Sequence, residues 1–270
     1  MESIYKIVSD QMIDEPDDLY HSKSKDFLSS HALIDFIRGP VIYRQKKLGI
    51  IPAMDSAVFS FGRACHTMIL EGVEVFDDRY AVGGPINPAT EKPYGVLTNK
   101  YKEWAKAQAK PVLSFDELTK IKNMFGGFLQ SGIASSLISN GMAEGVIRTN
   151  LCGFDCQIRV DYLNMFHGLV DLKTTRCLDT FIEDAIAFSY LKQLAFYHEV
   201  IFQVTGLMVP VYMVAVEKKA PFRCGVWLID PQEIMKATQE LRLAMAGLKL
   251  AIVEDRWPTG FEDTRKAILI

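Results

Sequence analysis

The order of secondary-structure patterns along this chain of 270 residues predicts an α/β (α+β) protein with a mixed central sheet flanked by helices. Helical patterns fill much of residues 29–138, β-type alternation follows over residues 144–174, and a helix, two strands and a long helix complete the chain. Hydrophobic residues make up 49% of the chain and charged residues 23%, a composition that excludes intrinsic disorder. We expect a poorly ordered segment over residues 1–20 and a single domain over residues 21–270.

The helices of the first half are delimited by capping residues and by breakers. Ser29 or Ser30 can cap a helix that Gly39-Pro40 stops, and the Ser114–Glu117 spacing is typical of a capping box. A stretch rich in Gly and Pro predicts a loop over residues 83–94. The expected helices cover residues 29–36, 56–70, 97–110, 115–129 and 133–138.

The second half predicts a strand meander followed by a helix, two further strands and a helix. The expected strands cover residues 144–149, 156–161, 169–174, 208–216 and 222–229. Between the third and fourth strands, residues 181–205 read as a helix broken near Ser189 and closed by Gly206. Asp230 can cap the last helix, which begins at Pro231 and runs to about Glu254.

The charge balance limits the possible partners. With 30 basic and 33 acidic residues the formal net charge is −3, which excludes a uniformly basic nucleic-acid coat but leaves room for a local basic patch. Arg44, Lys46 and Lys47 are candidate DNA-backbone contacts. The other candidates are four lysines of the expected helix over residues 97–110, for which a solvated helix face is an equally good interpretation: Lys100, Lys102, Lys106 and Lys110.

Targeting signals and disulfide patterns are missing from the sequence. No apolar run reaches the length of about 18 residues that a membrane span needs, and residues 1–16 are acidic and lack the apolar centre of a signal peptide. Five cysteines without dense spacing do not form a disulfide framework. We therefore expect a cytoplasmic protein without a membrane partner.

Three residues of the strand meander form the most informative pattern. A hairpin folded symmetrically about Phe166 places Asp161 opposite Asp171, and Lys173 lies on the same face as Asp171. Facing carboxylates repel unless a cation offsets them, and carboxylate oxygens suit Mg²⁺ or Mn²⁺. A lysine beside such a cation can orient a water or stabilise an anionic transition state, as metal-assisted phosphodiester hydrolysis requires. For these three residues alone, a solvated hairpin with an ordinary Asp–Lys pair is the commoner case.

Four further residues add to this pattern, although each also has an ordinary structural explanation. Glu144, at the start of the preceding strand, can add a third carboxylate or be a solvated junction residue. His66 lies on a helix of small and apolar residues, where it is either a metal ligand or an ordinary histidine. Gln193 and Tyr197 share one helix face, either as a packed polar edge or as a pair that holds the lysine and a DNA phosphate.

These segments, in this order, resemble the PD-(D/E)XK nuclease superfamily, in the branch of the RecB nuclease domain, phage lambda exonuclease and RecE (exodeoxyribonuclease VIII). The resemblance rests on residues 61–71 with their histidine, Glu144, residues 159–161, the Asp-Leu-Lys-Thr sequence at 171–174, and residues 190–197. Further similarity to the RecE-like phage and prophage exonucleases lies at residues 20–21, 28–33, 214–222 and 257–258. The likeness covers roughly residues 20–260 and implies a restriction-endonuclease-like core.

The resemblance implies a metal-dependent exodeoxyribonuclease that degrades one strand of linear double-stranded DNA from an end, 5′ to 3′, for recombination or single-strand annealing. It implies that Asp161, Asp171, His66 and the backbone carbonyl of Leu172 bind Mg²⁺ (or Mn²⁺). The catalytic set would be Lys173, Asp171, Asp161, Glu144, Gln193 and Tyr197. The implied partners are DNA ends, a RecT/Bet-like single-strand annealing protein and further copies of this chain in a ring, inside a bacterial host cell.

Other interpretations remain open. A RecB-type endonuclease or flap nuclease would have the same fold, and a non-catalytic DNA-end-binding recombination accessory protein would have a similar surface. Some relatives hold an iron–sulfur cluster through one upstream cysteine and three near the C-terminus. The cysteines of this chain do not match that pattern, so we expect no iron–sulfur cluster; they are Cys65, Cys152, Cys156, Cys177 and Cys224.

Overall fold

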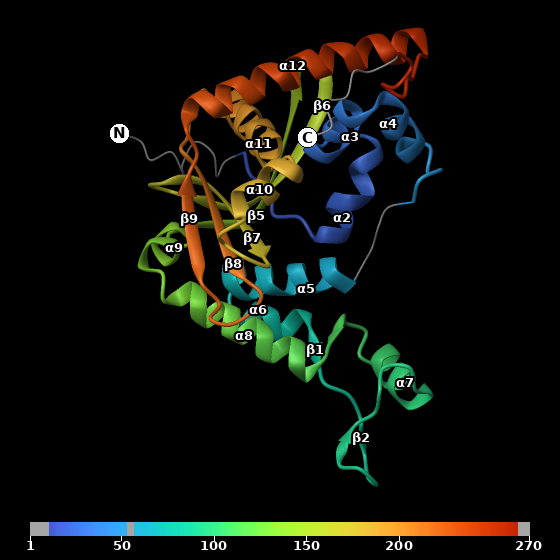
Figure 1. The fold of residues 1–270 in the computed structure, drawn as a ribbon, viewed down its shortest axis with the longest axis vertical. Coiled ribbons are helices and arrows are strands. Elements are labelled where there is room, and N and C mark those ends of the chain that lie inside the picture. Colours follow the sequence, from blue (N-terminus) through green and yellow to red (C-terminus); the bar gives the residue numbers. More distant parts are fainter. Residues whose placement is uncertain (1–10, 53–56, 264–270) are drawn as a thin grey trace, which may run out of the picture.

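A computed structural model describes residues 11–52 and 57–263 of the chain (Figure 1). At its centre lies a five-stranded sheet in the order β5-β6-β7-β8-β9. The β5–β6, β6–β7 and β8–β9 pairs are antiparallel and the β7–β8 pair is parallel, so the sheet is mixed as expected. Its strands are β5 (Gly141–Leu151), β6 (Phe154–Asn164), β7 (Gly168–Thr175), β8 (Val211–Glu217) and β9 (Cys224–Leu228).

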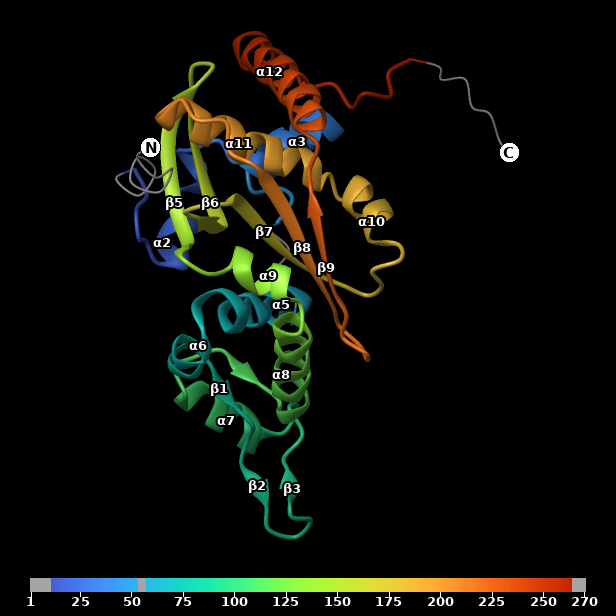
Figure 2. The same cartoon turned by 90° about the vertical axis from the view of Figure 1, so that its left-hand side faces the viewer.

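Helices cover both faces of this sheet (Figure 2). One group comprises α3 (Ser30–Arg38), α10 (Phe181–Ala187), α11 (Tyr190–Thr205) and α12 (Pro231–Glu254). The other comprises α5 (Ala57–His66), which continues as a π-helical turn over Thr67–Glu71, with α6 (Val73–Arg79), α8 (Phe115–Leu129) and α9 (Gly132–Leu137). The remaining elements are α2 (Asp17–Ser22), the 3-10 helix η1 (Lys23–Lys25), α4 (Pro40–Lys47), α7 (Asn99–Ala107), β1 (Ala81–Val82), β2 (Ile86–Asn87), β3 (Lys92–Pro93) and β4 (Val112–Leu113).

The sheet divides the hydrophobic core in two because alternate residues of each strand point to opposite faces. On β7, Leu169 packs into the cluster formed with α3, α11 and α12. Its neighbours Val170 and Leu172 pack into the second cluster, with α5, the π-helical turn and α8. Both faces of β7 are therefore buried, and a polar side chain on this strand meets protein on either side.

Local sequence signals set most helix ends where we expected them. The Ser29 hydroxyl accepts from the Ala32 N–H, and Ser114 and Glu117 form the complete capping box of α8. The Asp230 carboxylate caps α12 by accepting from the Gln232 N–H. Ser189 and Gly206 both have left-handed backbone conformations, which separates α10 from α11 and ends α11. The expected helix start at Ser56 lies outside the described residues.

The structure differs from the expectations in several places, which include unexpected elements such as α6 and the β1–β4 pair. Gly39-Pro40 ends α3, but Pro40 also opens α4, because a proline fits the first position of a helix. The loop expected over residues 83–94 contains the short β2–β3 hairpin. Part of the segment expected to be poorly ordered is held in place, since Ile13 exchanges two backbone hydrogen bonds with Val146 and residues 17–22 form α2.

Among the described residues, no helix combines the length and the apolar character that a membrane span requires.

Candidate active site

The site lies where β6 and β7 stop pairing through their backbones. Their ladder joins residues 162–164 to residues 168–170, which is the register symmetric about Phe166 that the sequence predicts. Beyond Tyr162 and Val170 a side chain takes over, because Asp161 Oδ2 accepts a 2.7 Å hydrogen bond from the Leu172 N–H. Asp161 and Asp171 therefore lie at one fork between two strands.

Lys173 joins this fork to helix α11. Its Nζ donates to Asp171 Oδ1 at 2.9 Å and to Gln193 Oε1 at 3.4 Å, and it lies 4.8 Å from the ring centre of Tyr190. The Gln193 amide in turn donates to the Tyr197 hydroxyl at 3.1 Å. The lysine, glutamine and tyrosine named from the sequence thus form one hydrogen-bonded chain.

A third carboxylate and an imidazole complete the arrangement. His66 is the last residue of α5, and ligand atoms of His66, Glu144 and Asp161 all lie within 4.8 Å of one another. His66 Nδ1 is 3.8 Å from Asp161 Oδ2. The β5–β6 ladder skips the Glu144–Asp161 pair, and Glu144 has a φ of 55°. A left-handed backbone at a glutamate is costly and re-aims its side chain, which is a common device at functional sites.

Arg159, which the sequence did not single out as a site residue, fixes the position of Glu144 and is itself paired with Asp17. Arg159 Nε donates to Glu144 Oε2 at 2.7 Å, and its Nη1 donates to Asp17 Oδ1 at 3.0 Å. Tyr190, against which Lys173 packs, was also missed. Both residues could have been found by their spacing from predicted site residues. Arg159 precedes Asp161 by two residues, and Tyr190 lies one helical turn before Gln193.

The carboxylates are crowded and desolvated. Burial raises the pKa of Glu144 to about 7, and the neighbouring Asp161 charge adds to the effect. Burial also raises the pKa of Asp161, and it raises that of Asp171 to about 6 against the opposing charge of Lys173. Like charges and low dielectric thus disfavour a fully ionised set of carboxylates, which a bound cation would relieve.

The two basic groups respond in opposite directions. Burial and the charge of Lys173 lower the pKa of His66 to about 4, although a hydrogen bond with the Leu172 backbone works the other way. The imidazole is therefore neutral at pH 7, which is the form that binds metals. Burial opposes the charged form of Lys173, but Asp171 and Asp161 outweigh it and raise its pKa. At pH 7 the site thus holds a charged ammonium beside a neutral imidazole.

The carboxylate and imidazole groups of the site fit the coordination of a divalent cation. Asp171 is buried, and its Oδ2 lies 2.8 Å from Lys173 Nζ but accepts no hydrogen bond from any described residue. One ammonium serves both oxygens of Asp171, so the negative charge of the three neighbouring carboxylates is offset only in part. Carboxylates and one imidazole suit Mg²⁺ or Mn²⁺. The residues that could hold the ion are His66, Glu144, Asp161 and Asp171, with the Leu172 backbone beside them.

The basic residues of α4 are engaged elsewhere in the chain. The Arg44 guanidinium lies 5.1 Å from the ring centre of Trp257. Lys46 pairs with Asp35 at 2.8 Å, and Lys47 donates to the backbone carbonyl of Lys25. Their role as DNA contacts stays a prediction, and each would first have to leave, or share, an intramolecular partner.

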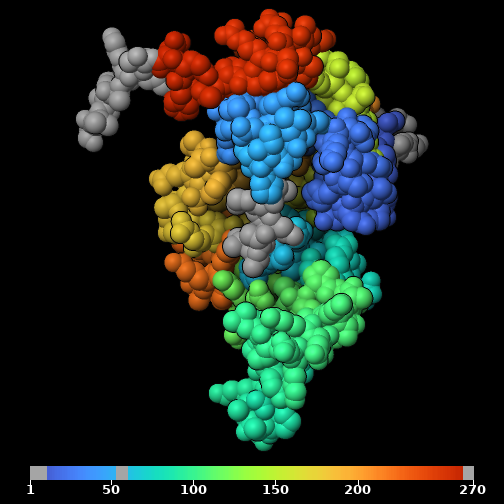
Figure 3. All heavy atoms as spheres, turned by 90° about the vertical axis from the view of Figure 1, so that its right-hand side faces the viewer, coloured from blue at the N-terminus to red at the C-terminus, as the bar shows by residue number. Residues whose placement is uncertain are grey.

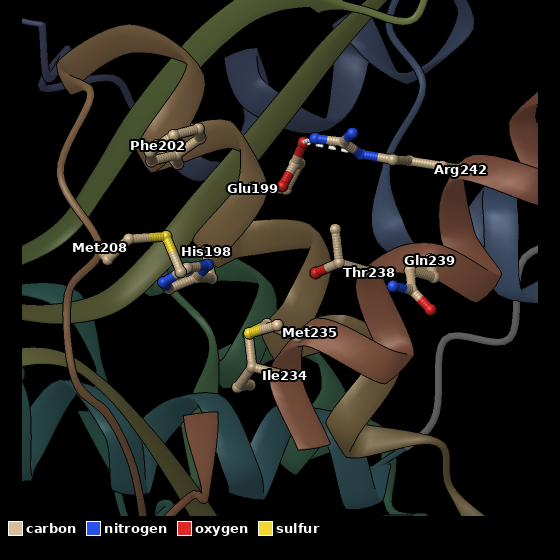
Figure 4. Close-up of a pocket in the computed structure, with 9 residues that line it drawn as sticks. All are labelled: His198, Glu199, Phe202, Met208, Ile234, Met235, Thr238, Gln239 and Arg242. Atoms are coloured by element: carbon tan, nitrogen blue, oxygen red, sulfur yellow. Dashed lines mark hydrogen bonds and ion pairs between the residues drawn. The ribbon is translucent and has the colours of Figure 1, made fainter. Parts of the chain in front are cut away.

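A separate pocket of about 300 Å³ opens between α11 and α12 (Figure 4). His198, Met208 and Met235 line it, and the Glu199–Arg242 ion pair lies at its edge, with Arg242 Nε 3.1 Å from Glu199 Oε1. None of the residues at the fork of β6 and β7 lines this pocket. The chemistry of the fork therefore has no part in it.

Comparison with known proteins agrees with this architecture. The structure is similar to the crystal structure of a protein from Eubacterium rectale described as "Putative exonuclease", with a TM-score of 0.63 and 13% sequence identity. The match covers 95% of this chain and 97% of that chain. At this identity the likeness concerns the fold. No curated protein matches the sequence.

The sequence itself gives the family. Residues 29–265 match the model of the "PDDEXK-like domain of unknown function (DUF3799)". This match includes all the catalytic and metal-binding side chains that the sequence predicted: His66, Glu144, Asp161, Asp171, Lys173, Gln193 and Tyr197. The chain belongs to this PDDEXK-like family.

Proposed function

We propose that this chain is a divalent-metal-dependent exodeoxyribonuclease, with Mg²⁺ as its ion, that degrades one strand of linear double-stranded DNA from an end. The observation that carries the proposal is the fork of β6 and β7, where Asp161, Asp171 and Lys173 converge beside His66 and Glu144. A buried, crowded set of carboxylates is costly for a protein that only binds DNA, because DNA is itself negatively charged.

The residues divide into ion-holding and charge-placing groups. His66, Glu144, Asp161 and Asp171 would hold the ion, which when bound lowers the pKa of water and neutralises phosphate charge. Lys173 brings a charged ammonium to the same place, where it can orient the attacking water or stabilise the negative charge that develops on the phosphate. Gln193 accepts from this ammonium, so α11 sets its direction.

The test is digestion of end-labelled linear duplexes, nicked circles and closed circles, each with Mg²⁺ and with EDTA. Exonuclease action predicts loss of linear duplex, intact closed circles and no reaction in EDTA. A label at the 5′ end released before a label at the 3′ end supports the 5′-to-3′ polarity. Cutting of closed circles would instead favour a RecB-type endonuclease, and cutting of a branched duplex, included as a further substrate, would favour a flap nuclease. Binding of ends without digestion would leave a recombination accessory protein.

The proposed partners need separate experiments. Sedimentation of the purified chain at micromolar concentration tests the ring-shaped homo-oligomer, which predicts a species of defined size above the 30.4 kDa monomer. Mixing with a single-strand annealing protein during digestion tests that partner, which predicts loading onto the exposed strand. A monomer that digests DNA would remove the ring from the proposal, and an annealing protein that does not load would remove that partner. Either outcome leaves the nuclease activity standing.

A further inference from the structure

Residues 83–111 form an arm that projects from the body of the protein. The chain leaves the body after β1 and returns at β4, and these two strands pair in parallel through Ala81–Val112 and Val82–Leu113. The β2–β3 hairpin forms one part of the arm and α7 the other. Figures 2 and 3 show this region extending away from the helices and the sheet that hold the fork.

The arm reverses the charge of the rest of the chain. It carries five lysines, no arginine and two glutamates, so its net charge is +3, whereas the whole chain has a net charge of −3. The five lysines are Lys92, Lys100, Lys102, Lys106 and Lys110, and all are exposed. A separation of charge of this size within one domain produces a local positive field that attracts a polyanion.

Three of these lysines are available for an external partner. The side chains of Lys92, Lys102 and Lys106 form no ion pair or hydrogen bond with any residue that the structure describes. Lys100, in contrast, donates to the Tyr94 hydroxyl at 3.1 Å, and Lys110 lies 3.7 Å from Asp78. Lys102 and Lys106 are four residues apart on α7, so they extend from one face of the helix.

The aromatic side chains of the arm are used inside it. The rings of Tyr101 and Trp104 lie 5.7 Å apart, and both side chains are half-buried. A Cβ on Gly84 would come within 3.0 Å of the Tyr101 ring, which shows how closely the hairpin base packs on α7. The arm thus exposes its lysines while its aromatic rings are half-buried, a combination that suits phosphates rather than unpaired bases.

We propose that the arm is a second DNA-binding surface, which grips the phosphate backbone of duplex DNA outside the active site without reading its sequence. The inference rests on the proposed nuclease function for its choice of polyanion. Duplex DNA carries one negative charge per about 1.7 Å of axis, the densest target for spaced lysines on a rigid helix. The basic side chains of α4 already have partners within the chain, whereas three lysines of the arm have none among the described residues.

The test compares two double variants that remove the same charge. Lys102→Gln with Lys106→Gln changes the arm, whereas Lys236→Gln with Lys249→Gln changes two exposed lysines of α12. Binding of a fluorescent duplex is measured by anisotropy over a salt series, in EDTA so that no cleavage occurs. We expect the arm variant to lose affinity several-fold at 0.1 M salt, with a salt slope shallower by about two, because each lost phosphate contact removes about 0.9 from the slope.

The outcomes separate this proposal from the nuclease proposal. An arm variant that binds like the α12 variant, with the same salt slope, would overturn the arm proposal even if digestion is normal. Equal loss of affinity for single-stranded and duplex DNA of one length would overturn the duplex assignment. Retained affinity in Lys102→Arg with Lys106→Arg supports it, because charge is then the property that matters. Loss of duplex binding in the glutamine variant supports the arm proposal even if the protein digests nothing.

Discussion

Asp161 Oδ2 accepts the backbone N–H of Leu172, at the point where the β6–β7 ladder would otherwise continue. The same oxygen lies 3.8 Å from His66 Nδ1. A carboxylate thus replaces a backbone contact between β6 and β7, while the next side chain of β7, Lys173, reaches Gln193 of α11. This hydrogen bond from side chain to backbone brings the end of α5, β6 and the lysine of β7 to one place.

The charge of Asp161, rather than its hydrogen bond, should carry activity. Asp161→Asn keeps an oxygen that can accept from Leu172 but removes the negative charge from the candidate metal site. We expect digestion of linear duplex to slow at least about 10²-fold, by analogy with the loss of other transition-state stabilisers. The increase in thermal midpoint that Mg²⁺ gives should shrink as well, since ligand binding stabilises the folded state.

The matched control is Asp155→Asn, which changes an exposed aspartate of the same strand. It should keep the digestion rate and the Mg²⁺-dependent shift. Wild-type digestion by Asp161→Asn would remove this residue from the active site.

Removal of the Lys173 ammonium should slow catalysis without weakening the binding of the metal ion. Lys173→Ala removes the ammonium that Asp171 and Gln193 hold, and we expect a rate loss of at least about 10²-fold. The lysine is not a ligand, so the Mg²⁺-dependent rise in thermal midpoint should persist. Lys192→Ala, which removes a neighbouring lysine paired with Glu240, serves as the control and should digest DNA normally. Parallel loss of rate and of the metal-dependent shift would contradict the division of roles.

Much of the site could be predicted because its signals are local. The hairpin register follows from the symmetric turn about Phe166, and the shared face of Gln193 and Tyr197 follows from helical spacing. The position of Glu144 could not be predicted in the same way. Its side chain reaches His66 and Asp161 because of a left-handed backbone in the middle of a strand, which no pattern of alternation encodes.

The parts of the fold that escaped prediction depend on distant contacts. Polar residues before position 20 gave no reason to expect order, yet Glu15 is buried against Arg148, 133 residues away. An ion pair of this kind has no sequence period. Pro40 likewise looked like a stop, and only the turn at Gly39 shows that it begins a second helix.

The buried ion pair of Glu15 should make stability depend on acid pH. Glu15 lies 2.5 Å from Arg148 and 2.6 Å from Lys23, and the Arg148 hydrogen bond lowers the pKa of Glu15 to about 2. A depressed folded pKa stabilises the protein above the unfolded value of 4.5 and loses that stabilisation as pH falls toward 2. Glu15→Gln should therefore cost about 3 kcal/mol at pH 7, where Arg148 loses its partner charge, and much less at pH 2.

Urea unfolding of both proteins at pH 7 and at pH 2–3 measures this difference. Glu74→Gln, at an exposed position of α6, is the control and should change stability little at either pH. An equal cost of Glu15→Gln at both pH values would show that its charge contributes nothing.

Two adjacent glycines of α8 should respond oppositely to the same substitution. A Cβ on Gly127 would lie 1.9 Å from the carbonyl oxygen of Phe222, whereas a Cβ on Gly126 would meet nothing within 4 Å. Gly126→Ala should raise the free energy of unfolding by about 0.5–1 kcal/mol, since alanine favours the helix. Gly127→Ala should lower it, because α8 must move away from the segment that joins β8 to β9, and overpacking of this kind costs about 1–3 kcal/mol. Denaturant unfolding of the two variants checks the pair, and stabilisation by both would show that α8 does not approach Phe222 this closely.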